Sequence, residues 1–186
     1  MFILCMIMYA IVIKIPMQMT ELIRLLGMKS VYERNTIRPN SEIPFVIITG
    51  NVTLSGIENV TLELFHPDHG STERNAVVLQ PCEPGNLMEM FLHDPKYSYV
   101  IKYLKGSPMN PKDLERAAAA DAETAILLTN RNSTDAYGTD HKNILIGLAM
   151  KKFVYDTTGK HLRLCMQLIK PESKQHYNSS IGQHQT

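Results

Sequence analysis

The sequence is poor in cysteine and carries almost no net charge, and each shortage excludes a class of protein. Its three cysteines, Cys5, Cys82 and Cys165, are widely separated and odd in number. They form neither a metal-binding spacing nor a disulfide framework, so we expect a reducing compartment. The formal net charge is only +1, which gives no electrostatic reason to expect nucleic acid as a partner.

A dinucleotide-binding loop is missing as well. Such a loop reads G-x-G-x-x-G between a strand and a helix, because the backbone must approach the pyrophosphate closely. Here the corresponding stretch is GNVTLSG (50–56), with Val52 in its middle. The next apolar run ends at Gln80 where an acid would hold the ribose, and Glu83 is displaced from that place. We therefore expect no cofactor.

Catalytic and metal-binding patterns are equally scarce. The sequence has no phosphate-binding lysine loop and no G-x-S-x-G elbow, and nothing nominates a nucleophile or a general base, so we do not expect an enzyme. His66 and His69, with Asp68 between them, form at best a weak metal site in a loop. Three further acids follow no ligand spacing: Glu83, Asp94 and Asp121. The sequence alone assigns no metal ligand.

One long apolar run is present, at the amino terminus. Residues 1–13, MFILCMIMYAIVI, contain no charge and are followed by Lys14 and Pro16. As a helix the run spans about 20 Å, less than the ~30 Å of a bilayer core, and it lacks the basic start and cleavage site of a signal peptide. Most apolar runs of this length are buried core elements, but the weak periodicity here favours lipid or pore surroundings. We expect residues 1–15 to be the cytoplasmic end of a transmembrane helix that begins before Met1, with Lys14 on the cytoplasmic side.

A helical pattern and a polar stretch follow this run. Met19 and Leu22 recur at helical spacing, with Glu21 on the opposite side. Residues 31–43 are polar and contain a proline. We interpret residues 16–43 as a linker.

From Pro44 onwards, strand-like and helix-like patterns alternate. Short apolar runs rich in β-branched residues predict strands at 45–50, 76–80, 99–106, 123–129 and 161–169. Helical patterns lie between them at 54–65, 86–92, 111–120 and 139–153. This alternation implies right-handed crossovers and a parallel sheet. The predicted fold is α/β, with a Rossmann-like parallel sheet over residues 44–171.

Local details refine this expectation. The run 99–106 is the least apolar of the strands and is expected near a sheet edge. Asn110 and Pro111 begin a helix, and we expect the alanine tract 117–120 to continue it and to let it lie close to the sheet. The last helical pattern carries an apolar stripe: Ile144, Leu145, Leu148, Ala149 and Phe153. The polar tail, residues 172–186, is expected to be disordered.

Six stretches of the sequence occur in a characteristic order. They read IPMQMTELIRLLGMKS (15–30), PFVIITGNVTLSG (44–56), YLKGSPMNPKDLERA (103–117), AILLTNRN (125–132), TDHKNILIGLAMKKF (139–153) and LRLCMQLIKPESKQHY (162–177). Together they resemble the junction between the pore-lining helix and the first RCK (regulator of K⁺ conductance) domain of the large-conductance Slo-family potassium channels. The ending QLIKPESKQH (167–176) is more similar to the sodium-activated, subfamily T branch than to the voltage- and calcium-activated branch.

The resemblance implies a ligand-gated membrane protein built from identical subunits. The family forms homotetramers whose cytosolic RCK domains assemble into a gating ring. An intracellular cation, sodium or calcium, bound in that ring pulls the linker and opens the pore. In this interpretation the RCK domain is cytoplasmic, and the chain reaches the membrane through its amino-terminal helix. The coupling between pore helix and linker is assigned to Lys14, Ile15, Pro16 and Glu21.

Two other functions stay open at this point. A nicotinamide-dependent oxidoreductase domain has the same architecture, and it would bind NAD⁺ or NADH with micromolar affinity. A soluble RCK-type regulatory subunit of a cation transporter would stay soluble without residues 1–13 and would form tetramers without a pore.

Overall fold

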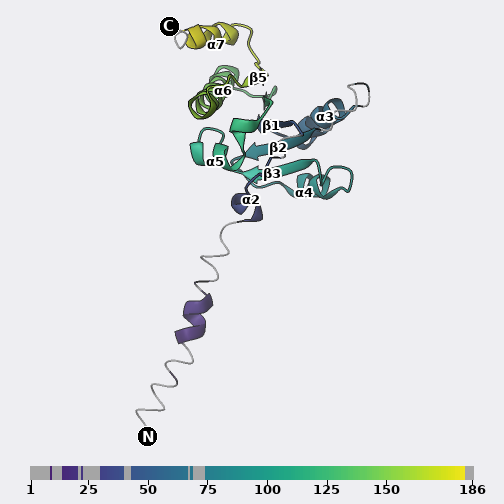
Figure 1. Cartoon of the computed structure of the whole chain (residues 1–186), viewed down its shortest axis with the longest axis vertical. Helices are drawn as coiled ribbons and strands as arrows, with labels where there is room; N and C mark the ends of the chain where they lie inside the picture. The colour runs from purple at the N-terminus through teal and green to yellow at the C-terminus, as the bar shows by residue number, and fades with distance from the viewer. Residues whose placement is uncertain are drawn as a thin grey trace. The chain divides into compact units, whose positions relative to one another are not determined.

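The computed structural model (Figure 1) describes residues 9, 14–20, 22, 30–39, 43–66, 68 and 74–182 of the chain. The chain divides into two compact units, Met1–Arg34 and Asn35–Thr186.

The first unit is helical over much of its described part. Residues 14–20 form helical turns, in which Thr20 Oγ1 donates a hydrogen bond to the carbonyl oxygen of Pro16 at 2.8 Å. The short helix α2 spans Val31–Arg34. Within the described ranges, no helix combines the length and the apolar character that crossing a bilayer requires. Most of the run 1–13 lies outside those ranges, so the expected transmembrane helix stays a prediction.

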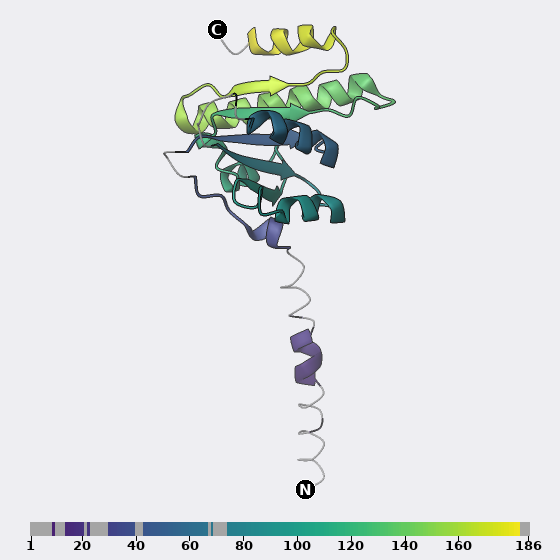
Figure 2. The same cartoon turned by 90° about the vertical axis from the view of Figure 1, so that its right-hand side faces the viewer.

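The second unit is built on a five-stranded parallel sheet (Figures 1 and 2). Its strands are β1 (Phe45–Gly50), β2 (Asn75–Gln80), β3 (Ile101–Lys105), β4 (Thr124–Leu128) and β5 (Arg163–Met166). Their order across the sheet is β3-β2-β1-β4-β5, and every neighbouring pair is parallel. The first strand, β1, lies in the middle of the sheet. β2 and β3 are added on one side of it, and β4 and β5 on the other, which is the topology of a doubly wound, Rossmann-like fold. The predicted α/β fold is confirmed, and the third strand lies at an edge as expected.

Helices connect the successive strands. They are α3 (Leu54–Leu64), α4 (Asn86–His93), α5 (Pro111–Arg116), the 3₁₀ turn η2 (Ala119–Asp121) and α6 (Ala136–Thr158). Since such crossovers are right-handed, the change of direction across the sheet places α3 and α4 on one face and α5 and α6 on the other. Side chains satisfy free N–H groups where helices begin. Thr53 Oγ1 accepts from the N–H of Gly56 at 3.2 Å, and Asp135 Oδ1 accepts from the N–H of Gly138 at 2.9 Å.

The core lies on both faces of the sheet, because β1 and β2 are buried along almost their whole length. Ile47 and Leu79 pack with Leu114 of α5 in one cluster. Ile48 is also fully buried, and as the next residue along β1 it points to the opposite face. A strand covered on both faces reads as a continuous apolar run, which is the pattern found in the sequence.

The helix that begins after Asn110 is shorter than the sequence predicts. It ends at Arg116, Ala117 is its C-cap, and Ala118 adopts a left-handed conformation with a φ of 51°. The expectation that the alanine tract continues the helix is therefore wrong, although the tract does lie against the sheet. Ala117 and Ala119 are fully buried in the core cluster. The chain must turn there to enter β4, so tertiary packing overrides the helix propensity of alanine.

The carboxyl-terminal tail is helical as far as the structure describes it. Helix α7 spans Ser173–Gly182 and corrects the expectation of disorder over those residues. It packs on α6, where the rings of His176 and His141 meet edge to face with centroids 5.6 Å apart. Lys151 Nζ of α6 lies 5.6 Å from the ring centroid of Tyr177. These contacts involve polar side chains, so a search for apolar periodicity does not detect them.

The fifth strand is also shorter than expected. β5 covers only Arg163–Met166 of the predicted run 161–169. It is an edge strand that pairs with β4 alone. One further hydrogen bond, from the Gln167 N–H to the Leu127 carbonyl oxygen at 3.0 Å, follows the end of the strand.

Candidate functional site at the carboxyl end of the sheet

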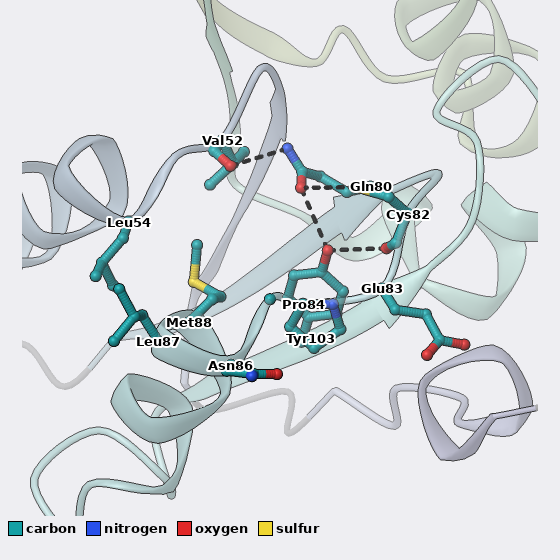
Figure 3. Close-up of a pocket in the computed structure, with 11 residues that line it drawn as sticks. Val52, Leu54, Gln80, Cys82, Glu83, Pro84, Asn86, Leu87, Met88 and Tyr103 are labelled. Atoms are coloured by element: carbon teal, nitrogen blue, oxygen red, sulfur yellow. Dashed lines mark hydrogen bonds between the residues drawn. The ribbon is translucent and has the colours of Figure 1, made fainter.

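The carboxyl ends of parallel strands meet at one edge of a sheet, where doubly wound folds place their ligands. At this edge the described part of the chain has a hollow of about 430 Å³, which we call the β2-end pocket (Figure 3). Its lining comes from the β1–α3 turn, the end of β2, the β2–α4 loop, the start of α4 and β3: Val52, Leu54, Gln80, Cys82, Glu83, Pro84, Gly85, Asn86, Leu87, Met88 and Tyr103.

Gln80 forms hydrogen bonds with several segments that line this pocket (Figure 3). Its Nε2 donates to the carbonyl oxygens of Val52 and Gly50, at 3.2 and 3.3 Å. The Tyr103 hydroxyl lies 3.2 Å from Gln80 Oε1 and 2.9 Å from the carbonyl oxygen of Cys82. Gln80 occupies the place where a dinucleotide-binding fold carries its ribose-binding acid. Here the side chain instead holds the β1–α3 turn against β2 and β3.

The β1–α3 turn lies directly against the end of β4. Gly50 has a φ of 94°, and a Cβ built on it would clash with the carbonyl oxygen of Leu128. The Asn51 N–H donates to that same oxygen at 2.9 Å, and Val52 is buried. The crevice between β1 and β4 is where dinucleotide folds bind a pyrophosphate. In this chain Gly50 and Asn51 contact Leu128 of β4 at that place.

The acids singled out from the sequence do not converge. Glu83 follows β2 and pairs with Lys105 Nζ at 3.3 Å. Asp94 precedes β3, and its Oδ1 accepts from the N–H of Lys96 at 2.8 Å. Asp121 lies in η2, ahead of β4. Because the strands are parallel, the latter two acids lie toward the opposite end of the sheet from Glu83.

The weak metal site suggested by the loop after α3 is only partly described. His66 Nδ1 lies 3.5 Å from Asp68 Oδ2, and it accepts from the Asp68 N–H at 3.3 Å. His69 lies outside the described residues. In the part of the chain that the structure describes, no three His, Cys, Asp or Glu side chains gather in a way that could hold a metal ion.

A second polar network, which the sequence pattern did not reveal, joins α5 to the end of β3. Asp113 Oδ1 lies 2.8 Å from Arg116 Nη1, and Asp113 Oδ2 accepts from the Ser107 N–H at 2.9 Å and from Asn110 Nδ2 at 3.0 Å. Arg116 Nη1 also donates to the carbonyl oxygen of Lys105 at 3.2 Å. Burial raises the pKa of Asp113, but the bonds from Ser107 and Arg116 outweigh it and lower that pKa below its ordinary value. The spacing Asp113-x-x-Arg116 could have indicated this ion pair in the sequence, since residues three apart share a helix face.

A third network attaches the chain after β5 to α6. Asp140 is fully buried, and its two carboxylate oxygens accept from the N–H groups of Ile169 and Lys170 at 2.8 and 2.9 Å. Burial raises the pKa of Asp140, but these bonds outweigh it and hold the pKa below its usual value. An acid on the buried face of a helix needs such partners.

The residues assigned to coupling lie in the first unit. Lys14, Ile15 and Pro16 are exposed in the described helical turns. Glu21 lies outside the described residues. Their role therefore stays a prediction.

Comparison with known proteins points to one family. The family model for the calcium-activated potassium channel slowpoke-like RCK domain matches residues 42–181. Potassium channel subfamily T member 1 from Gallus gallus, Mus musculus and Homo sapiens is 34% identical over 100 residues, in each case covering 54% of this chain. The chain spans only 8% of the length of these relatives.

Two solved structures share the fold. The human SLO3 gating ring superimposes with a TM-score of 0.54 at 24% identity, covering 73% of this chain and 21% of that one. The GsuK RCK domain superimposes with a TM-score of 0.51 at 13% identity, covering 84% and 28%. At these identities the likeness concerns the fold alone.

Proposed function

The chain belongs to the family of slowpoke-like RCK domains, and from this membership we propose that it is a gating-ring segment that transmits the binding of an intracellular cation, sodium or calcium, to the pore of a potassium channel. The observation that carries the proposal is the family match over residues 42–181. The family resemblance visible in the sequence and the relatedness to potassium channel subfamily T member 1 point the same way.

The geometry of the site supports a mechanical role over a catalytic one. The parallel sheet is buried on both faces, so the second unit can act as a rigid lobe. Gln80 is engaged in bonds to the β1–α3 turn, and the turn itself rests on Leu128. Both positions that a dinucleotide fold devotes to its cofactor hold the lobe together here.

The proposal includes a division of the chain. Residues 1–15 form the cytoplasmic end of a pore-lining helix in the membrane, and residues 16–43 form the linker. Residues 44–171 form a cytoplasmic RCK lobe, followed by the tail 172–186. Identical subunits assemble through their lobes into a tetrameric ring, and Lys14, Ile15, Pro16 and Glu21 couple the pore helix to the linker.

A chimeric channel tests this function. Residues 44–177 replace the matching segment of human potassium channel subfamily T member 1, and potassium currents are recorded from inside-out patches. We expect currents that rise when sodium or calcium is added at the cytoplasmic face. A chimera that reaches the cell surface, as measured by surface labelling, and conducts equally with and without both cations contradicts the proposal.

A further inference from the structure

The chain enters the second unit through a short extended segment, residues 35–39, which we call the strap. Three hydrogen bonds and one packing contact hold the strap on the lobe ahead of β1. The Asn35 carbonyl oxygen accepts from Nε and Nη2 of Arg116, at 3.3 and 3.1 Å. The Ile37 N–H donates to the carbonyl oxygen of Arg116 at 2.8 Å, and the side chain of Ile37 packs against the core cluster. Arg116 thus holds the strap with both its side chain and its backbone.

The guanidinium of Arg116 is fixed in place by the lobe itself. Nη1 lies 2.8 Å from Asp113 Oδ1 and donates to the carbonyl oxygen of Lys105, the last residue of β3, at 3.2 Å. Asp113 packs so tightly on the turn after β3 that a Cβ at Gly106 would lie 2.8 Å from its Cγ. One side chain therefore connects the strap, α5 and the end of an edge strand.

We propose that Arg116 is the positioning residue that fastens the linker to the RCK lobe. When the lobe moves, Asn35 and the linker residues next to it then move with the lobe. The inference rests on the proposed function for its consequence, but the fastening itself is a property of this chain. The strap precedes β1 in the chain. A force transmitted between the linker and the lobe therefore acts on the Arg116 contacts before it acts on the sheet.

The geometry requires arginine and not only a positive charge. A guanidinium offers five N–H donors in a rigid planar fork, whereas a lysine ammonium is a single charge on a flexible stem. Arg116 uses Nε, Nη1 and Nη2 toward acceptors on different segments. A lysine at this position can keep an ion pair with Asp113 but cannot span the same acceptors.

Hydrogen exchange on the 186-residue chain tests the fastening. We expect Arg116→Lys to speed exchange of the Ile37 amide by about tenfold or more, the change that the loss of ~1.4 kcal/mol of local stability produces. Exchange of the β1 amides should change much less, because the sheet does not depend on the strap contact. The matched control is Lys152→Arg, the reverse exchange in an exposed pair in which Nζ lies 3.3 Å from Asp156 Oδ2. It should leave Ile37 unchanged.

A second variant keeps the test decisive where Arg116→Lys fails to fold. Asp113→Asn keeps the shape of the side chain and removes the charge that orients the guanidinium, so it should also speed exchange at Ile37. Ile37 exchange equal to that of the unmodified chain in a folded variant overturns the inference. So does a rise that is equal at Ile37 and in β1, because it indicates general destabilisation.

Patch recording then tests the consequence. In a version of the chimera described above that carries residues 35–177, and so includes the strap, Arg116→Lys should lower the maximal open probability at saturating cation by about threefold or more, whereas Lys152→Arg should leave it unchanged. A cation-gated chimera whose gating is indifferent to Arg116→Lys overturns the transmission role even where exchange at Ile37 is faster. A chimera with Arg116 intact that ignores both cations overturns the proposed function instead, and the exchange result then decides the fastening by itself.

Discussion

Single residues at the carboxyl end of the sheet hold the β1–α3 turn in place. Gln80 Nε2 donates to the carbonyl oxygens of Gly50 and Val52, where β1 leads into the turn before α3. The positive φ of Gly50 allows the chain to contact Leu128 of β4 there. The absence of a dinucleotide-binding glycine loop could be recognised from the sequence. The sequence did not reveal that Gln80 replaces the ribose acid with a structural role, because a hydrogen bond between distant segments leaves no periodic signal.

Replacing Gln80 by glutamate tests this role. Glutamate cannot donate, so Gln80→Glu leaves the carbonyl oxygens of Gly50 and Val52 without their partner and places a negative charge beside them. We expect a loss of about 1–3 kcal/mol in the free energy of unfolding, measured by urea denaturation at neutral pH. An unchanged denaturation midpoint would show that the amide does not hold the turn.

Gly50 offers a comparison of two glycines. Gly50→Ala forces a side chain into the left-handed region and against Leu128, so it should destabilise the fold by about 1–3 kcal/mol or more. Gly85→Ala is the matched control, since Gly85 has a φ of −70° and nothing lies within 4 Å of a Cβ there. Thermal unfolding compares the two variants. Equal melting temperatures would contradict the close packing of the turn on β4.

Asp140 should make the stability of the fold depend on acid. Its carboxylate is held by the N–H groups of Ile169 and Lys170, which keep its pKa in the folded chain below the ordinary value. The charge therefore stabilises the fold fully above the unfolded pKa of about 3.9, and this contribution is lost as pH falls through the lower folded pKa.

The corresponding variant is Asp140→Asn. At pH 7 it should lower the free energy of unfolding by about 1.5–3 kcal/mol, and its deficit should shrink as the pH falls below about 4. Asp156→Asn, in an exposed pair with Lys152 on the same helix, is the control and should cost less than about 1 kcal/mol. Denaturation curves between neutral and acid pH decide the point. A deficit that stays constant with pH would exclude a role for the charge.

At the scale of elements, the buried strands β1 and β2 were predicted closely, whereas the apolar face of α6 was not. β1 and β2 are covered on both faces, and the resulting apolar runs are readable directly in the sequence. In α6 the predicted apolar stripe was only partly right: Ile144 is buried, but Leu145 is 55% exposed, and Ile146 and Met150 are buried instead. α6 packs against β5 on one side and α7 on another. A helix with several partners has no single apolar stripe for the sequence to display.

The end of α5 gives a prediction at this scale. Ala118 is in the left-handed region with a φ of 51°, where glycine is not strained. Ala118→Gly should therefore leave the free energy of unfolding unchanged or raise it by up to about 1 kcal/mol. Ala119→Gly, at a fully buried position of η2, should lower it by ~1 kcal/mol. Urea denaturation compares the two, and a larger loss for Ala118→Gly would contradict the left-handed turn that ends the helix.

At the scale of the whole molecule, the fold class followed from the alternation of strands and helices, whereas the attachments between segments did not. The hydrogen bond from Arg116 to Asn35 and the one from Ile169 to Asp140 each join segments far apart in the sequence. Such contacts depend on where the fold brings the chain together, so spacing in the sequence does not encode them. The same attachments give the lobe fixed connections before β1 and after β5. A domain with these connections suits the transmission of movement between a ligand site and a linker.

We propose above that this lobe turns cation binding into opening of a potassium pore. The most direct test of this proposal is the open probability of the chimera in inside-out patches, recorded while sodium or calcium is stepped at the cytoplasmic face and potassium is kept constant. We expect a reversible rise of open probability with at least one of the two cations. An open probability that is equal in their presence and absence, in a chimera shown to reach the surface, would contradict it.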